Sequence, residues 1–166
     1  VDKTLLIRDL VDDQVPVILF TRPRRFGKTL ALDMLKSYFE KTSEDTSVYF
    51  RDKKIWACGE KYRKLQGTFP VISITFKDAK FSDWGSTFEA IKNVIRDEYM
   101  RHSELFSSDC LNPVEQDYLL RLQSDQLNEV EYTRSLLNLE RMLEKHHHSK
   151  AIVLIDEYDT PIQQGH

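Results

Sequence analysis

The sequence predicts an α/β fold in which a parallel sheet is covered by helices on both faces. Three apolar runs are the expected strands, at residues 16–20, 70–76 and 151–155, and segments of helical periodicity separate them. Strands that alternate with helices are typical of parallel sheets, because parallel neighbours need a long crossover connection. With 166 residues and a hydrophobic content of 40%, the chain is long enough for one such domain with a substantial core.

The first half of the chain supplies two of these strands and the helices around them. A short helix is expected over residues 2–11, followed by the strand at Pro16–Phe20. A longer helix then runs from Lys28 to about Glu40, because its apolar residues share one face; these are Ala31, Met34, Leu35 and Tyr38. Residues 41–47 read as a loop and residues 60–65 as a short helix.

The second strand, Pro70–Phe76, is rich in β-branched residues, and a helical segment at about 82–148 follows it. Asn112 and Asn128 each precede a glutamate by three residues, a spacing that predicts a capping box at a helix start. The helices carry apolar stripes that we assign to the core: Trp84, Phe88, Ile91, Ile95 and Tyr99 in the first, and Tyr132, Leu136, Leu139 and Leu143 in the last. The histidines at 146–148 are expected to form a polar helix end rather than a metal site, because adjacent helical positions point about 100° apart.

The segment between the first strand and its helix has the composition of a phosphate-binding loop. The strand runs into Thr21-Arg22-Pro23-Arg24-Arg25-Phe26-Gly27-Lys28-Thr29. In the Walker A pattern, a first glycine is followed by four variable residues and then by Gly-Lys-Thr/Ser. Backbone N–H groups at the helix start bind phosphate oxygens, the lysine reaches the β- and γ-phosphates, and the hydroxyl group of the Thr or Ser binds Mg²⁺. Arg22 stands where the first glycine is expected.

The third strand, Ala151–Ile155, is continuously apolar and ends in Asp156-Glu157, as expected of the Walker B half of the same site. We therefore predict that Lys28 contacts the phosphates of ATP and that Thr29 and Asp156 hold Mg²⁺. Glu157 is the candidate general base, which makes Glu157 and Lys28 the expected catalytic residues; a structural carboxylate is the other interpretation of Glu157. The expected nucleotide-binding residues are Arg22, Pro23, Arg24, Arg25, Phe26, Gly27, Lys28, Thr29 and Leu30.

Composition favours a soluble cytoplasmic protein. The formal net charge of −3 and the pI near 6.0 argue against a surface that generally coats nucleic acid. Cys58 and Cys110 are far apart and suit a reducing compartment. No run approaches the length of a membrane span.

With these residues in place, the chain resembles the bacterial AAA-ATPase-like family. The resemblance rests on DKTLLI near the start, FTRPRRFGKTL at the loop, PVI with FKD at the second strand and VLIDEYDTPI at the acidic strand. It implies that Arg22 is the family's own loop variant and that the protein is an ATPase of the AAA/STAND kind, often followed by a region similar to PD-(D/E)XK nucleases. It also implies that residues 1–166 are the N-terminal part of a single P-loop domain with a helical insertion at about 82–148.

The expected fold is therefore a three-layer P-loop NTPase of the additional-strand, catalytic-glutamate type, truncated after the Walker B strand. In such sheets the strand after the acidic one inserts beside the loop strand, so we expect a gap at the centre of the sheet and a segment that does not fold cooperatively alone. The expected function is Mg-ATP binding and hydrolysis coupled to a conformational or assembly switch, with a homo-oligomer possible. Two alternatives are a nucleotide-dependent binding module without significant turnover and a nucleic-acid-directed protein that uses Arg22, Arg24 and Arg25.

Overall fold

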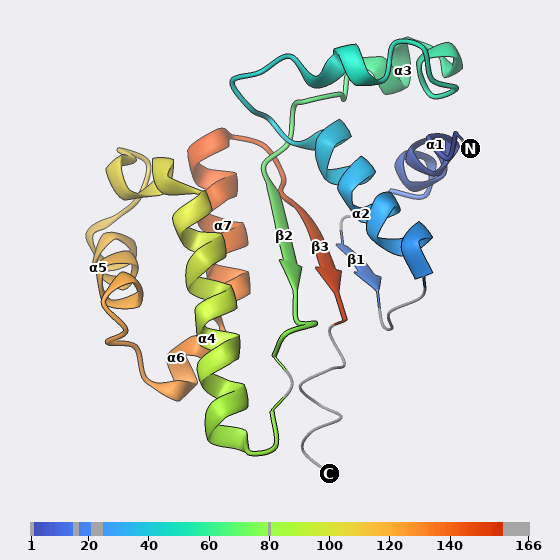
Figure 1. Cartoon of the computed structure of the whole chain (residues 1–166). Coiled ribbons are helices and arrows are strands. Elements are labelled where there is room, and N and C mark those ends of the chain that lie inside the picture. Colours follow the sequence, from blue (N-terminus) through green and yellow to red (C-terminus); the bar gives the residue numbers. More distant parts are fainter. Residues whose placement is uncertain (1, 15–16, 21–24, 80, 158–166) are drawn as a thin grey trace.

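The computed structural model describes residues 2–14, 17–20, 25–79 and 81–157, and the side chains of residues 18–20 and 25–29 are outside that description. The chain forms an α/β fold with a small parallel sheet between two groups of helices (Figure 1). The order of elements is the one predicted: helix, strand, helix, strand, several helices, strand.

The sheet has three parallel strands in the order β1-β3-β2: β1 (Val17–Phe20), β2 (Val71–Thr75) and β3 (Ile152–Asp156). The central strand β3 is paired along its whole length, from Val71↔Ile152 to Thr75↔Asp156 on one side and from Val17↔Val153 to Phe20↔Asp156 on the other. Its apolar residues are buried on both faces, as a continuous apolar run predicts.

The expected gap between the loop strand and the acidic strand is not there, because β1 and β3 are hydrogen-bonded neighbours. Two apolar strands with free backbone edges satisfy each other's N–H and C=O groups when they pair. The sheet of the described residues therefore has no central gap, and the instability inferred from such a gap does not apply to it. The additional-strand type of the fold stays a prediction.

One face of the sheet is covered by α1 (Leu5–Asp12) and α2 (Arg25–Phe39) (Figure 1). Leu154 and Ile152 point to this side and pack in one core with Ile7, Leu35 and Tyr38. The chain then passes through short helical turns at Thr46–Tyr49 and Trp56–Cys58 to α3 (Glu60–Arg63), which lies beyond the amino ends of the strands (Figure 1). The short helix predicted near residues 60–65 is thus confirmed.

The other face is covered by α4 (Trp84–Arg101) and α7 (Ser135–His147). Outside them lie a turn at Ser103–Ser107, α5 (Pro113–Gln123) and α6 (Glu129–Thr133) (Figure 1). Asn112 and Asn128 form the predicted capping boxes with Glu115 and Glu131. The histidines form a helix end, as predicted, with His148 in the left-handed conformation that closes α7.

Two details of this helical region differ from the prediction. The last helix is not continuous, because it breaks at Arg134 between α6 and α7. Beside the break the Thr133 hydroxyl donates to the carbonyl of Val130, and the Ser135 hydroxyl donates to that of Tyr132. Such local hydrogen bonds compete with the helical ladder.

The second difference is that Trp84, assigned to the core, is 55% exposed. It occupies the first position of α4 and stacks on Phe88, so only one face of its ring is covered.

Candidate nucleotide site

The carboxyl ends of the three strands meet at one edge of the sheet, and Asp156 lies at the centre of that edge. Asp156 is the register partner of Phe20 in β1 and of Thr75 in β2. The chain leaves β1 at this same edge and starts α2 at Arg25. In open parallel sheets ligands bind outside the carboxyl ends of the strands, so this edge is the candidate site.

The helix that follows β1 begins at Arg25, earlier than the predicted start at Lys28. Gly27 therefore lies in the first turn of α2, where backbone N–H groups have no partner within the helix, and Lys28 and Thr29 follow directly after it. This turn contains no acidic residue. The backbone at a helix start carries the positive end of the helix dipole, which favours the binding of an anion such as a phosphate group.

Asp156 and Glu157 are both buried, with 6% and 8% of their surface exposed. The backbone N–H of Phe76 donates to the carbonyl of Asp156 at 3.0 Å, which ties the end of β3 to the segment after β2. Glu157 ends the strand in the left-handed region, with a φ of 54°. Non-glycine residues seldom adopt this conformation, and it costs energy that functional sites often retain.

The structure thus brings the first turn of α2 and the acidic pair to one edge of the sheet. Leu30, a further predicted nucleotide contact, is 64% exposed. Arg22, Pro23 and Arg24 lie outside the described residues, as do the side chains of Arg25 to Thr29. Contacts of Lys28 and Thr29 with phosphate and metal therefore stay predictions.

The described residues include no group of three histidines, cysteines or carboxylates placed to hold a metal ion by themselves. A magnesium site in a nucleotide pocket does not require one, since Mg²⁺ is usually held by one or two protein oxygens together with phosphate oxygens and waters. The buried carboxylate of Asp156 is a hard oxygen donor of the kind this ion prefers, so the residues present fit the predicted group.

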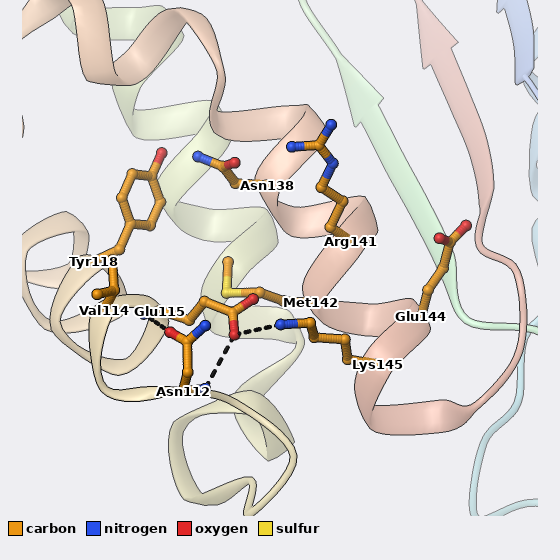
Figure 2. A pocket seen from close by; sticks show the side chains of 9 residues that line it. All are labelled: Asn112, Val114, Glu115, Tyr118, Asn138, Arg141, Met142, Glu144 and Lys145. Carbon is orange, nitrogen blue, oxygen red and sulfur yellow. Dashed lines mark hydrogen bonds and ion pairs between the residues drawn. The ribbon is translucent and has the colours of Figure 1, made fainter.

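A cavity of about 630 Å³ lies elsewhere, between α5 and α7 (Figure 2). Its polar lining is largely engaged within the protein: the Glu115 carboxylate accepts from the backbone N–H of Asn112 at 3.0 Å and from Lys145 Nζ at 2.8 Å (Figure 2). Leu30, Asp156 and Glu157, the predicted site residues whose side chains are described, do not line this cavity. We therefore assign the candidate site to the strand ends and not to this cavity.

A second cavity, of about 470 Å³, opens near the start of β2 beside a cluster of charged residues. The cluster consists of Glu40, Glu98, Arg101, His102, Glu104 and His147. Sequence reasoning missed it, although Glu98 carried a signal: it interrupts the apolar face of α4, three residues after Ile95.

None of the helices in the described part of the chain combines the length and apolar character that a membrane crossing requires. Comparison with known proteins gave no significant match to a curated protein or to a solved structure. A family model described as AAA-ATPase-like, predicted AAA-ATPase, matches residues 1–165. Because this match spans nearly the whole chain, the protein belongs to the AAA-ATPase-like family of predicted AAA-ATPases.

Proposed function

We propose that the protein binds Mg-ATP at the carboxyl edge of its sheet and hydrolyses it. The observation that carries the proposal is the placement of two buried carboxylates, Asp156 and Glu157, on the strand that pairs directly with the strand leading into α2. A P-loop nucleotidase needs these two halves, an anion cradle at a helix start and an acidic strand end, on neighbouring parts of one edge.

The first half of the site binds the phosphates. Backbone N–H groups of the first turn of α2 would donate to phosphate oxygens, and Lys28 would neutralise charge on the β- and γ-phosphates as the terminal group leaves. Thr29 and Asp156 would hold Mg²⁺, which when bound withdraws charge from the phosphate oxygens. Membership of a family of predicted AAA-ATPases supports this set of ligands.

The second half activates water. Glu157 follows the metal-side aspartate directly, and its backbone is in the left-handed region. We assign it the role of general base, which accepts the proton of the attacking water. Its position beside Asp156, with 8% of its surface exposed, places the carboxylate at the same edge of the sheet as the proposed metal ligand.

The remaining basic residues of the loop, Arg22, Arg24 and Arg25, complete the proposal. A guanidinium near the γ-phosphate stabilises the charge of the transition state, whether it acts in its own subunit or across a contact between subunits. ATP turnover would then be coupled to a conformational or assembly switch.

The test is single-turnover hydrolysis of ATP by the parent protein and by Glu157→Gln, with Glu129→Gln as control, because Glu129 is an exposed glutamate of α6 far from the strand ends. Glu157→Gln should slow hydrolysis on the order of 10²-fold or more and keep ATP affinity within a few-fold, since it removes a base and preserves shape. Glu129→Gln should behave as the parent does.

Each of the two alternative functions predicts a different result. ATP binding without measurable turnover in the parent would identify a nucleotide-dependent binding module. DNA binding that falls steeply with salt and ignores ATP would identify a nucleic-acid-directed protein. Equal turnover in the parent and in Glu157→Gln would contradict the assignment of the base.

A further inference from the structure

The outer edge of β2 is the feature that carries an inference beyond nucleotide binding. Within the described residues, β3 is the strand paired with β2, and the other edge of β2 carries only a single bridge, between Phe69 and Glu40, just before the strand. The carbonyl of Pro70 and the N–H of Phe76 form hydrogen bonds with β3. Because backbone groups alternate in direction along a strand, the N–H and C=O groups of even-numbered residues face β3, and those of Val71, Ser73 and Thr75 face the outer edge. Exposed strand edges of this kind are sites of pairing with another chain.

Two side chains of α4 occupy this edge. The Ser73 N–H donates to Glu98 Oε2 at 2.9 Å, and Arg101 Nη2 donates to the carbonyl of Val71 at 2.7 Å. Arg101 also donates to Glu98 from Nε at 2.9 Å and from Nη2 at 2.7 Å. The pair therefore acts as one unit.

The geometry matches what a neighbouring strand would offer. In a parallel ladder, one residue of the added strand donates its N–H to the carbonyl of residue i−1 and accepts, through its C=O, from the N–H of residue i+1. Arg101 supplies that donor to Val71, and Glu98 supplies that acceptor to Ser73. The two side chains thus take the place of one residue of a partner strand.

Glu40 and His102 hold the Glu98–Arg101 pair in position. Arg101 Nη1 contacts Glu40 Oε2 at 2.6 Å, which ties α4 to the end of α2, and His102 Nε2 lies 3.1 Å from Glu98 Oε2. Burial raises the pKa of Glu98, but hydrogen bonds from Arg101 and His102 outweigh it, so the pKa lies below its usual value and the carboxylate stays charged near neutral pH. Glu98 is only 5% exposed, so it cannot turn to solvent without disrupting the packing of α4.

We propose that Glu98 and Arg101 close the outer edge of β2 against strand addition, and that without them this edge pairs with the β2 edge of a second copy of the chain. Two copies related by a twofold axis present the same edge to each other, so each supplies the missing donors and acceptors of its partner. In the intact protein any added strand is excluded from β2.

The experiment compares the parent chain with Glu98→Ala and Arg101→Ala by amide hydrogen exchange and by sedimentation over a range of protein concentrations. Arg96→Ala is the matched control, because Arg96 is also on α4 and pairs with Asp125, away from β2. At low concentration the Ser73 amide should exchange about tenfold faster or more in Glu98→Ala than in the parent. At high concentration both edge variants should self-associate more than the parent and Arg96→Ala.

A second change separates edge pairing from general destabilisation. Ser73→Pro removes the outward N–H without touching the bonds to β3, and proline is tolerated on the free side of edge strands. Added to Glu98→Ala, it should return self-association to the parent level, whereas a merely unfolded variant would not be rescued. If Glu98→Ala does not fold, the sedimentation comparison and its reversal by Ser73→Pro apply to Arg101→Gln, which leaves Glu98 its contact with His102.

The proposal is overturned by any one of three results. These are edge variants that fold and associate no more than Arg96→Ala, a Ser73 amide that exchanges at the parent rate in Glu98→Ala, and an association that Ser73→Pro leaves unchanged.

Discussion

Glu157 holds a backbone conformation that glycine adopts more easily, which makes Glu157→Gly an informative change. Its φ is 54°. The left-handed region costs a residue with a side chain about 1–2 kcal/mol, while glycine loses roughly 0.5–1 kcal/mol more conformational entropy on folding. The backbone part of the change therefore favours Glu157→Gly by about 0–1.5 kcal/mol in the free energy of unfolding. The same change removes the proposed base and all contacts of the Glu157 side chain.

His148→Gly is the matched control, because His148 has a φ of 53° and is an exposed residue directly after α7. The same arithmetic applies to it, and glycine is favoured at this position after a helix. Urea unfolding without nucleotide, followed by the fluorescence of the two tryptophans, measures both variants. Because the backbone gain is shared, the difference between the two variants measures what the Glu157 side chain contributes to stability. We expect this difference to be smaller than about 3 kcal/mol, and ATP hydrolysis to be lost only in Glu157→Gly.

The refuting result is a large loss of stability. If Glu157→Gly is less stable than His148→Gly by about 3 kcal/mol or more, the cost of breaking a buried ion pair, then the Glu157 carboxylate is chiefly structural. The general base must then lie elsewhere.

Three further predictions concern the charged cluster beside β2. Arg101→Ala should lower the free energy of unfolding at pH 7 by about 3 kcal/mol, because Glu98 stays buried without its main partner. Burial raises the pKa of Glu98 and Arg101 lowers it, so Glu98 of the variant takes up a proton more readily than Glu98 of the parent, and the loss should shrink as the pH falls. A loss independent of pH would contradict this. Burial raises the pKa of Glu104, but hydrogen bonds from His102, from the backbone and from His147 outweigh this effect and lower the pKa to about 2. The contribution of Glu104 to the free energy of unfolding is therefore present above about pH 4.5 and is lost as the pH falls through about 2. Unfolding of Glu104→Gln should therefore converge with that of the parent on acidification, and a constant difference would refute it. Burial lowers the pKa of His102, but its hydrogen bonds with Glu104 and Glu98 outweigh this effect and raise the pKa. The contribution of His102 to the free energy of unfolding is therefore complete below pH 6.5 and declines above it. In His102→Gln, measured over the same pH range, this decline should be absent.

The parts of the fold that sequence predicted well are those with local causes. The capping boxes at Asn112 and Asn128 depend on residues three apart, and both formed as expected. The strand ending in Asp156 is a continuous apolar run, which is typical of a central parallel strand. Local sequence thus identified the elements and the acidic strand end.

The features that the sequence did not predict depend on contacts between distant residues or on small local differences in hydrogen bonding. The adjacency of β1 and β3 depends on which backbone edges are available to pair, which periodicity does not encode. The break at Arg134 arises from hydroxyl groups that bond to nearby carbonyls within an otherwise helical pattern. The cluster around Glu98 joins α2, β2 and α4, and no spacing rule connects residues 40, 73 and 98.

For the candidate site, too, the sequence predicted the features that have local causes and not the others. A short motif indicated Lys28 and Thr29, and the end of an apolar run indicated Asp156 and Glu157. The left-handed backbone of Glu157 could not be predicted, because a glutamate carries no local preference for it.

The most direct test of the central claim is calorimetric titration of Mg-ATP into the parent protein, Lys28→Ala and Lys36→Ala. Lys36 lies in the last turn of the same helix, away from the proposed phosphates, and controls for lost charge. Loss of a charge-assisted contact to phosphate should weaken binding by about 2–3 kcal/mol, or roughly 30- to 150-fold, in Lys28→Ala, while Lys36→Ala binds as the parent does. Equal affinity in Lys28→Ala and the parent would contradict the assignment of the nucleotide site.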